Sequence, residues 1–191
     1  MGYSFCLGSG FVKTKKLTTS SIMIAIAVVL SFVVIYRLPS GGAVTAASMV
    51  PIIMISVMYG TKWGVFSALC YALVQGVVGF YAPPVPNFLS FVVVILFDYV
   101  FAFGILGTAG FFVKITGKRK YSYAFASAVV VFLRFLCHLV SGIFIWSAFA
   151  PEGQSPFLYS LIYNGSYMLP ELIITALVTG IIVSKIVNRN I

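Results

Sequence analysis

The chain has 191 residues, of which 61% are hydrophobic and only 8% are charged, and its mean hydropathy is +1.11. A soluble globular domain carries about 25% charged residues, so this composition excludes a soluble domain, a disordered chain and a disulfide scaffold. The apolar segments are continuous and do not alternate, which argues against a transmembrane barrel. The composition therefore predicts an all-α integral membrane protein with room for six spans of about 20 residues.

Turn-forming and charged stretches divide the chain into six predicted transmembrane helices, which together form one membrane domain over residues 1–191. A basic segment, residues 1–16, precedes the first helix. Glycine- and proline-rich stretches at 38–42 and 82–87 and a basic stretch at 114–120 separate later helices. The predicted spans are about 17–36, 44–60, 63–81, 88–113, 121–149 and 157–187.

The distribution of basic residues predicts that the N- and C-termini are both cytoplasmic. Only Arg37 then falls in an outer loop, and Arg134 falls within a span. An even number of spans is needed for this bias, and basic residues flanking spans favour the cytoplasmic side. Because they are spread over four separate segments, the lipid bilayer is an expected partner and nucleic acid is not. The residues placed inside are Lys13, Lys15, Lys16, Lys62, Lys114, Lys118, Arg119, Lys120, Lys185 and Arg189.

Motifs for catalysis or for a resident cofactor are missing from the sequence. Cys6, Cys70 and Cys137 have no CxxC spacing and predict neither a disulfide framework nor a metal site. The chain contains no HExxH motif, no nucleophile turn and no GxxxxGK[ST] loop. We therefore expect no catalytic residues and no cofactor, and any pumping must draw its energy from partners or an ion gradient.

Ionisable residues within predicted spans are costly and are usually functional. Asp98 lies in the fourth span, Arg134 and His138 lie four residues apart on one face of the fifth, and Glu171 lies in the sixth. One interpretation is structural: an internal ion pair, such as Asp98 with Arg134, that only joins helices.

Depth favours a second interpretation, a binding site in the outer half of the membrane. Asp98 follows Asn87 by 11 residues, or about 16 Å, and His138 precedes Ala148 by 10 residues, or about 15 Å. A carboxylate among aromatic rings suits a cationic ligand. The sequence thus predicts a site for a small polar ligand bound from outside. Further polar and aromatic side chains are expected on the same side: Trp146, Tyr159, Tyr163 and Asn164.

Several short segments resemble the thiamine-specific substrate-binding subunits (ThiT type) of energy-coupling factor (ECF) transporters. They are RFLCHLVSGIFIW at 134–146, SAFAPEG at 147–153, YSLIYNG at 159–165, FDY at 97–99, and GG at 41–42 leading to MVP at 49–51. The resemblance runs from about Thr18 to the C-terminus. It implies a six-helix, multi-pass protein of the bacterial cell membrane that binds thiamine near the outer surface. It also implies docking on a transmembrane coupling subunit that carries two ATPase subunits.

The same resemblance implies which residues bind the substrate. The family's acidic residue and the tyrosine after it fall on Asp98 and Tyr99, and its histidine falls on His138. Its tryptophan, tyrosine and asparagine fall on Trp146, Tyr159 and Asn164, with Tyr163 and Gly42 as additional pocket candidates. Some family members have a tryptophan and a glutamate at the start of the second helix, where this chain has GAVTA at 42–46.

A contact with the coupling subunit is expected on the first helix, where Ser21 and Ala25 have the small-xxx-small spacing that permits close backbone approach. Ordinary internal helix packing explains this spacing equally well. For the whole chain, the alternatives to a thiamine-binding subunit are a subunit for another small vitamin or a thiamine precursor, a membrane scaffold protein whose polar residues pair internally, and a small intramembrane enzyme.

Overall fold

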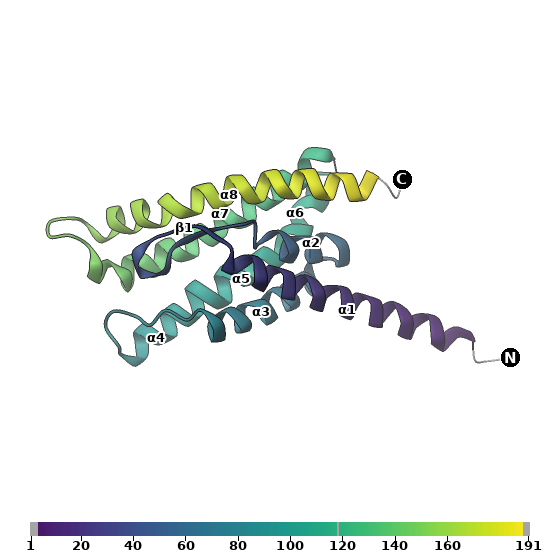
Figure 1. Ribbon diagram of the computed structural model, residues 1–191, viewed down its shortest axis with the longest axis horizontal. Helices are drawn as coiled ribbons and strands as arrows, with labels where there is room; N and C mark the ends of the chain where they lie inside the picture. Colours follow the sequence, from purple (N-terminus) through teal and green to yellow (C-terminus); the bar gives the residue numbers. More distant parts are fainter. Residues whose placement is uncertain (1–3, 118, 189–191) are drawn as a thin grey trace.

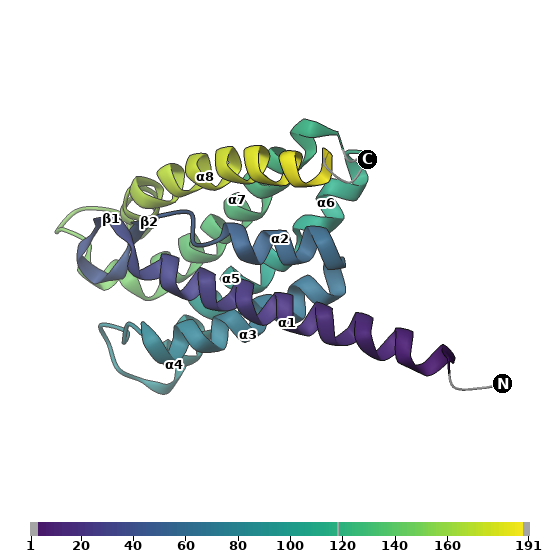
Figure 2. The ribbon, with the colours of Figure 1, turned by 45° about the vertical axis from the view of Figure 1, so that its right-hand side comes forward.

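The structure, a computed structural model, describes residues 4–117 and 119–188 as a bundle of helices with one short β-hairpin (Figures 1 and 2). The first half of the chain forms α1 (Ser4–Phe32), β1 (Val34–Arg37), the 3-10 turn η1 (Pro39–Gly41), β2 (Ala43–Thr45), α2 (Val50–Tyr59) and α3 (Thr61–Val78). The second half ends with α7 (Lys120–Phe144), the 3-10 turn η4 (Trp146–Phe149) and α8 (Pro156–Asn188).

Between these halves, one helical rod runs from Phe88 to Ile115 and changes its winding along its length. It consists of α4 (Phe88–Val94), the π-helical turn η2 (Ile95–Phe101), α5 (Ala102–Gly104), the 3-10 turn η3 (Ile105–Thr108) and α6 (Ala109–Ile115). The side chain of Asn87 caps its first turn by accepting a hydrogen bond from the Ser90 N–H at 2.8 Å.

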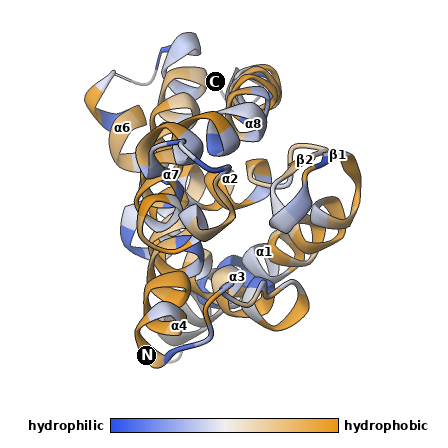
Figure 3. Cartoon of the chain, turned by 90° about the vertical axis from the view of Figure 1, so that its left-hand side faces the viewer, coloured by the Kyte–Doolittle hydropathy of each residue, from blue (hydrophilic) through white to orange (hydrophobic). Residues whose placement is uncertain are grey.

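Four helices among the described residues are long and apolar enough to cross a membrane: Lys13–Phe32, Phe88–Ile115, Tyr121–Phe144 and Pro156–Ile182. Helix α2 has 10 residues, or about 15 Å of rise, which is shorter than the hydrocarbon core of about 30 Å. Spanning by α2 and α3 stays a prediction. Most of the helical ribbon is coloured as hydrophobic in Figure 3, in keeping with a lipid-facing exterior.

The main difference from the predicted spans is the hairpin. The first helix was expected to reach Tyr36, but α1 ends at Phe32 and Val34–Arg37 pair as β1 with β2 in antiparallel register. The run from Val33 to Tyr36 is β-branched and aromatic, which favours a strand. The second helix begins at Val50 rather than Val44, with Pro51 in its first turn, where a missing N–H costs nothing.

The core forms where α2 lies between α1, α3 and the α7–α8 pair, and three isoleucines of α2 are fully buried: Ile52, Ile53 and Ile55. Helices α7 and α8 run side by side along most of their length (Figures 1 and 2). Close approach of α2, α3 and the 88–115 rod depends on small residues. The Ser56 hydroxyl donates to the Gly107 carbonyl and accepts from the Gly110 N–H.

The two ends of the bundle differ in character. The hairpin and the loops at 79–87 and 150–155 gather at one end, on the left of Figure 1, whereas α2 and α6 end on the other side. Exposed basic residues occur in elements of that second side, including Lys62, Lys114 and Lys185. Lys16 stacks there over the ring of Trp63, with its ammonium 4.3 Å from the ring centroid.

We predict that Gly107→Ala destabilises the protein by about 1–3 kcal/mol, because overpacking a close helix contact forces the backbone apart. A Cβ at Gly107 would meet backbone atoms of Gly64 and Val65. Thermal unfolding in detergent measures the effect. Gly165→Ala is the matched control, since a Cβ there meets no atom within 4 Å and alanine favours the helix. A Gly107→Ala variant as stable as Gly165→Ala would contradict this packing.

Candidate substrate-binding site

A cavity of about 650 Å³ opens at the hairpin end of the bundle. Its walls come from the hairpin, α3 and the loop after it, η2, α7 and α8. The structure brings all eight predicted substrate-binding and pocket residues to this one cavity: Gly42, Asp98, Tyr99, His138, Trp146, Tyr159, Tyr163 and Asn164. Their roles in binding stay predictions.

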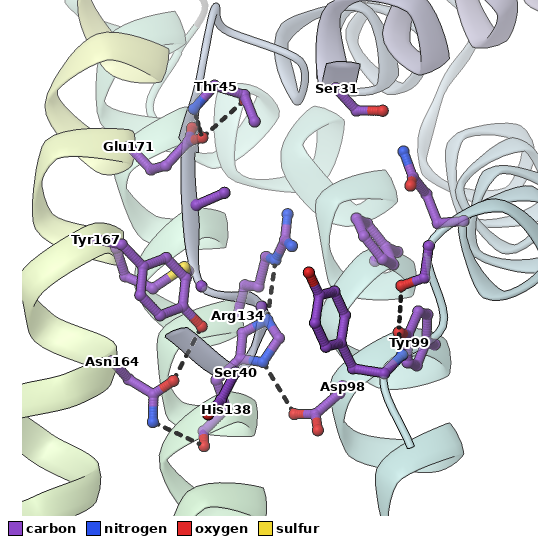
Figure 4. A pocket seen from close by; sticks show the side chains of 18 of the residues that line it. Ser31, Ser40, Thr45, Asp98, Tyr99, Arg134, His138, Asn164, Tyr167 and Glu171 are labelled. Atoms are coloured by element: carbon purple, nitrogen blue, oxygen red, sulfur yellow. Dashed lines mark hydrogen bonds and ion pairs between the residues drawn. The ribbon is translucent and has the colours of Figure 1, made fainter. Parts of the chain in front are cut away.

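The carboxylate of Asp98 accepts three hydrogen bonds from the end of α7 and the turn after it (Figure 4 shows the one from His138). His138 Nδ1 lies 2.9 Å from Oδ1, Ser141 Oγ donates to Oδ2 at 2.7 Å, and Trp146 Nε1 donates to Oδ2 at 2.9 Å. The side chains of Asp98 and His138 are each 12% exposed. Asp98 thus joins the 88–115 rod to α7.

The ion-pair alternative from the sequence named the wrong partner for Asp98. Its partner is His138 and not Arg134, whose Nε donates to His138 Nε2 at 3.3 Å. Because Nε2 accepts a hydrogen bond, Nδ1 is the protonated nitrogen that donates to Asp98 in a neutral imidazole. The result is a chain of hydrogen bonds from Arg134 through His138 to Asp98, visible in Figure 4.

Local winding explains how Asp98 and Tyr99, neighbours in sequence, both reach the cavity. They lie in the π-helical turn η2, and such turns are frequent at functional sites. The Tyr99 hydroxyl donates to the Gly79 carbonyl at 2.9 Å and accepts from the Tyr81 N–H at 3.1 Å. Tyr99 therefore anchors the loop that follows α3, and its ring stacks on Phe80 at 5.6 Å.

Trp146 was predicted to extend the His138 face within one long helix, but α7 ends at Phe144. Trp146 instead begins the 3-10 turn η4, and its indole bends back to Asp98 and to Ser141 Oγ at 3.1 Å. Its ring stacks with Phe149 at 6.3 Å and 24°. The indole therefore lines the cavity beside the carboxylate to which it donates.

Helix α8 presents a ladder of tyrosines to the cavity at four-residue spacing, which keeps them on one helix face. Tyr159 stacks on Tyr163 at 5.9 Å, and Tyr163 meets Tyr167 edge to face at 6.0 Å. The Tyr163 hydroxyl accepts from the Gly42 N–H at 3.1 Å and donates to the Pro39 carbonyl, so it fixes the hairpin turn. A side chain at Gly42 would collide with Tyr167 and Tyr163.

Asn164 is 5% exposed and fully hydrogen-bonded within the protein. Its Nδ2 donates to the His138 carbonyl at 3.2 Å and to the Ser160 carbonyl at 3.0 Å, and its Oδ1 accepts from the Tyr167 hydroxyl at 2.9 Å. The bond to the His138 carbonyl fixes the position of α8 along the axis of α7. The hydrogen bonds of Asn164 also orient the Tyr167 ring beside His138, at a centroid distance of 6.3 Å.

The predicted coupling contacts lie elsewhere. Ser21 and Ala25 are exposed on α1 and do not line the cavity, and Ser21 Oγ donates only to the Leu17 carbonyl one turn earlier. Ala27, two residues on, is fully buried. Their exposure leaves the small-xxx-small face open to a partner, and its role stays a prediction.

Sequence reasoning missed Ser141, which lies three residues after His138 on nearly the same helix face. That spacing is the signal that could have found it. Arg134 and Glu171 were noticed as intramembrane charges without a role, and both line the cavity. Cys70 and Cys137 are free thiols. Among residues 4–117 and 119–188, no group of three or more His, Cys, Asp or Glu side chains could hold a metal ion.

Fold and site together define a multi-pass helical membrane protein with a polar, aromatic-lined pocket. The family described as "Thiamine transporter protein" matches residues 17–190, and this chain belongs to that family. It is 35% identical over 174 residues to thiamine transporter ThiT of Bacillus subtilis, which covers 85% of this chain and 87% of the relative.

Two further comparisons agree. The chain is 31% identical over 98 residues to thiamine transporter ThiT of Lacticaseibacillus paracasei, covering 47% of this chain and 49% of the relative. A solved structure of ThiT from Listeria monocytogenes superposes with a TM-score of 0.74 at 21% identity, over 91% of this chain and 95% of that one. At that identity, the likeness supports the fold.

Proposed function

We propose that this protein is the substrate-binding subunit of an ECF-type vitamin importer and captures thiamine in the cavity beside the hairpin. The observation that carries the proposal is the convergence of Asp98, His138, Trp146 and Asn164 on one cavity in a chain of the thiamine transporter family. Aromatic rings from η2, η4 and α8 line the cavity and suit a flat, cationic heterocycle. The transporter family implies that the protein is not an enzyme.

In this proposal the cavity faces the outside of a bacterial cell membrane, with both termini in the cytoplasm. Exposed basic residues at the other end of the bundle, such as Lys62 and Lys114, support this orientation through the positive-inside rule. The cation–π contact of Lys16 with Trp63 is also at that end. The pocket then lies in the outer half of the bilayer.

The proposed partners are a transmembrane coupling subunit and two ATPase subunits. The chain has no phosphate-binding loop, so it cannot supply the energy for uptake by hydrolysing ATP with such a loop. The exposed Ser21 and Ala25 face of α1 is the proposed docking site for the coupling subunit, because small residues allow close helix approach.

Asp98→Asn is expected to weaken thiamine binding by at least about tenfold, or 1.4 kcal/mol. The amide oxygen of asparagine can replace Oδ1 as the acceptor for His138. Its NH₂ group then takes the place of Oδ2 and faces Ser141 and Trp146, which both donate hydrogen bonds to Oδ2 in the wild type. Calorimetry on the purified protein measures the affinity. Glu152→Gln, which removes an exposed carboxylate outside the cavity, is the control. Unchanged affinity in a folded Asp98→Asn protein would refute this role.

Vesicles that contain only this protein are expected to bind thiamine without accumulating it. Binding requires the cavity alone, whereas uptake requires the proposed ATPase partners. Radiolabelled thiamine distinguishes surface-bound from internal ligand, and vesicles that also contain the coupling and ATPase subunits provide the positive control. Accumulation against a gradient without ATP would contradict the proposed division of labour.

Thiamine is expected to change the intrinsic fluorescence, and Trp146→Phe is expected to remove most of that change. The chain has two tryptophans. Trp146 lines the cavity, whereas Trp63 bonds to Ser20 near the other end of the bundle. Trp63→Phe is the matched control and should preserve the signal. A ligand-induced change that survives intact in Trp146→Phe would place the ligand away from this indole.

A further inference from the structure

Glu171 has a carboxylate oxygen that lacks a hydrogen-bond partner among the residues that the structure describes. Its side chain lines the cavity and is 2% exposed. Oε1 accepts from the Thr45 N–H at 2.5 Å and from the Thr45 hydroxyl at 2.7 Å. Oε2 is buried and accepts no hydrogen bond from any residue in the described ranges, 4–117 and 119–188. A buried carboxylate oxygen without a donor is costly, so the position calls for a donor from outside the chain.

Arg134 brings unused donors to the same end of the cavity. Its Nε bonds to His138, and its guanidinium stacks over the Phe103 ring at 4.2 Å. The two Nη atoms donate no hydrogen bond within the part of the chain that the structure describes. In Figure 4 the guanidinium points toward the end of the cavity where Glu171 and Thr45 lie, away from Asp98 and Asn164.

Helix geometry places both groups deeper than the predicted substrate residues. The bond between Asn164 and the His138 carbonyl marks one common level of α7 and α8. From that level, Arg134 lies four residues along α7 and Glu171 seven residues along α8. These separations correspond to about 6 Å and about 10 Å. The two side chains therefore lie at the inner end of the cavity, below the cluster around Asp98, to which Arg134 is linked through His138.

Arg134 and Glu171 do not satisfy each other directly. Asp98 with His138 is the one ion pair found within 4.0 Å among the described residues, so no nitrogen of Arg134 approaches a carboxylate oxygen of Glu171 this closely. The inner end thus presents free donors on one side and a free acceptor on the other. A group that accepts and donates at the same time is complementary to this arrangement.

Building on the proposed function, we propose that Arg134 and Glu171 form an inner subsite that recognises a neutral polar group of the substrate. The group accepts from the Arg134 guanidinium and donates to Glu171 Oε2, while Thr45 keeps Oε1 in position. Thiamine has two groups of this kind: the edge of its aminopyrimidine ring, where an amino group adjoins a ring nitrogen, and its hydroxyethyl group. Either one gives the substrate a second anchor beyond the Asp98 cluster.

The test is calorimetry on the full-length protein with three ligands: thiamine, the analogue whose amino group is replaced by a carbonyl oxygen, and the analogue whose hydroxyl is replaced by hydrogen. Glu171→Gln retains an acceptor for Thr45 and replaces the free oxygen with an NH₂ group. Arg134→Met retains packing over Phe103 and removes the guanidinium. Thr175→Val is the matched control, since Thr175 is buried one turn beyond Glu171 on α8 but does not line the cavity.

Glu171→Gln and Arg134→Met are each expected to weaken thiamine binding by at least about tenfold, whereas Thr175→Val binds like the wild type. Wild type is expected to reject one analogue, and both variants should lose that discrimination. The rejected analogue identifies the group that enters the subsite.

Two results would overturn the inner subsite while leaving the proposed function intact. One is that the wild-type protein binds thiamine and that Glu171→Gln or Arg134→Met binds it with the same affinity. The other is an equal loss of affinity for all three ligands, which would limit these side chains to a structural role. A wild-type protein that does not bind thiamine would overturn the proposed function itself, and this inference with it.

Discussion

The partly buried carboxylate of Asp98 makes the hydrogen bonds on which the site depends. An acidic group within a membrane protein needs internal donors because lipid offers none, and here His138, Ser141 and Trp146 supply them. The three donors come from one helix end and the turn that follows it. By bonding to all of them, Asp98 joins the 88–115 rod to α7 and orients an imidazole and an indole at the cavity.

The polar side chains that α8 contributes to the cavity also find their hydrogen-bond partners within the protein. Asn164 satisfies both ends of its amide within α7 and α8, and Tyr163 uses its hydroxyl to bind the hairpin turn. The polar groups that line the cavity are therefore largely held by the protein itself, which pre-organises the site and lowers the entropic cost of binding. Glu171 and Arg134 depart from this pattern, because one oxygen of Glu171 and the Nη atoms of Arg134 have no hydrogen-bond partner among the described residues.

The segments that line the cavity differ from the helix faces that contact lipid. The cavity is lined by the regular helices α3, α7 and α8 and by the irregular hairpin, η2 and η4. Irregular backbone is tolerated in a membrane protein where it lines a cavity or is buried in protein. The regular, apolar faces of α1, α7 and α8 remain for contact with lipid.

The sequence alone predicted the class of protein and eight of the residues that line the cavity. Charge placement and apolar runs predicted a helical membrane protein. A bilayer penalises exposed polar groups so strongly that hydropathy by itself reveals the membrane-spanning segments. Intramembrane ionisable residues then pointed to Asp98 and His138. The resemblance added Tyr99, and the structure places all three in one cavity.

Only the tertiary structure decided which side chains and which strands pair with each other. Sequence spacing made Arg134 as reasonable a partner for Asp98 as His138, since the two are one turn apart on one face of α7, and the choice depends on the angle at which η2 crosses that helix. The hairpin escaped prediction because β1 and β2 are short, and their pairing depends on contacts more than 100 residues away, at Tyr163 and Glu171. The free oxygen of Glu171 likewise follows from three-dimensional packing, because a missing partner has no signature in a linear sequence.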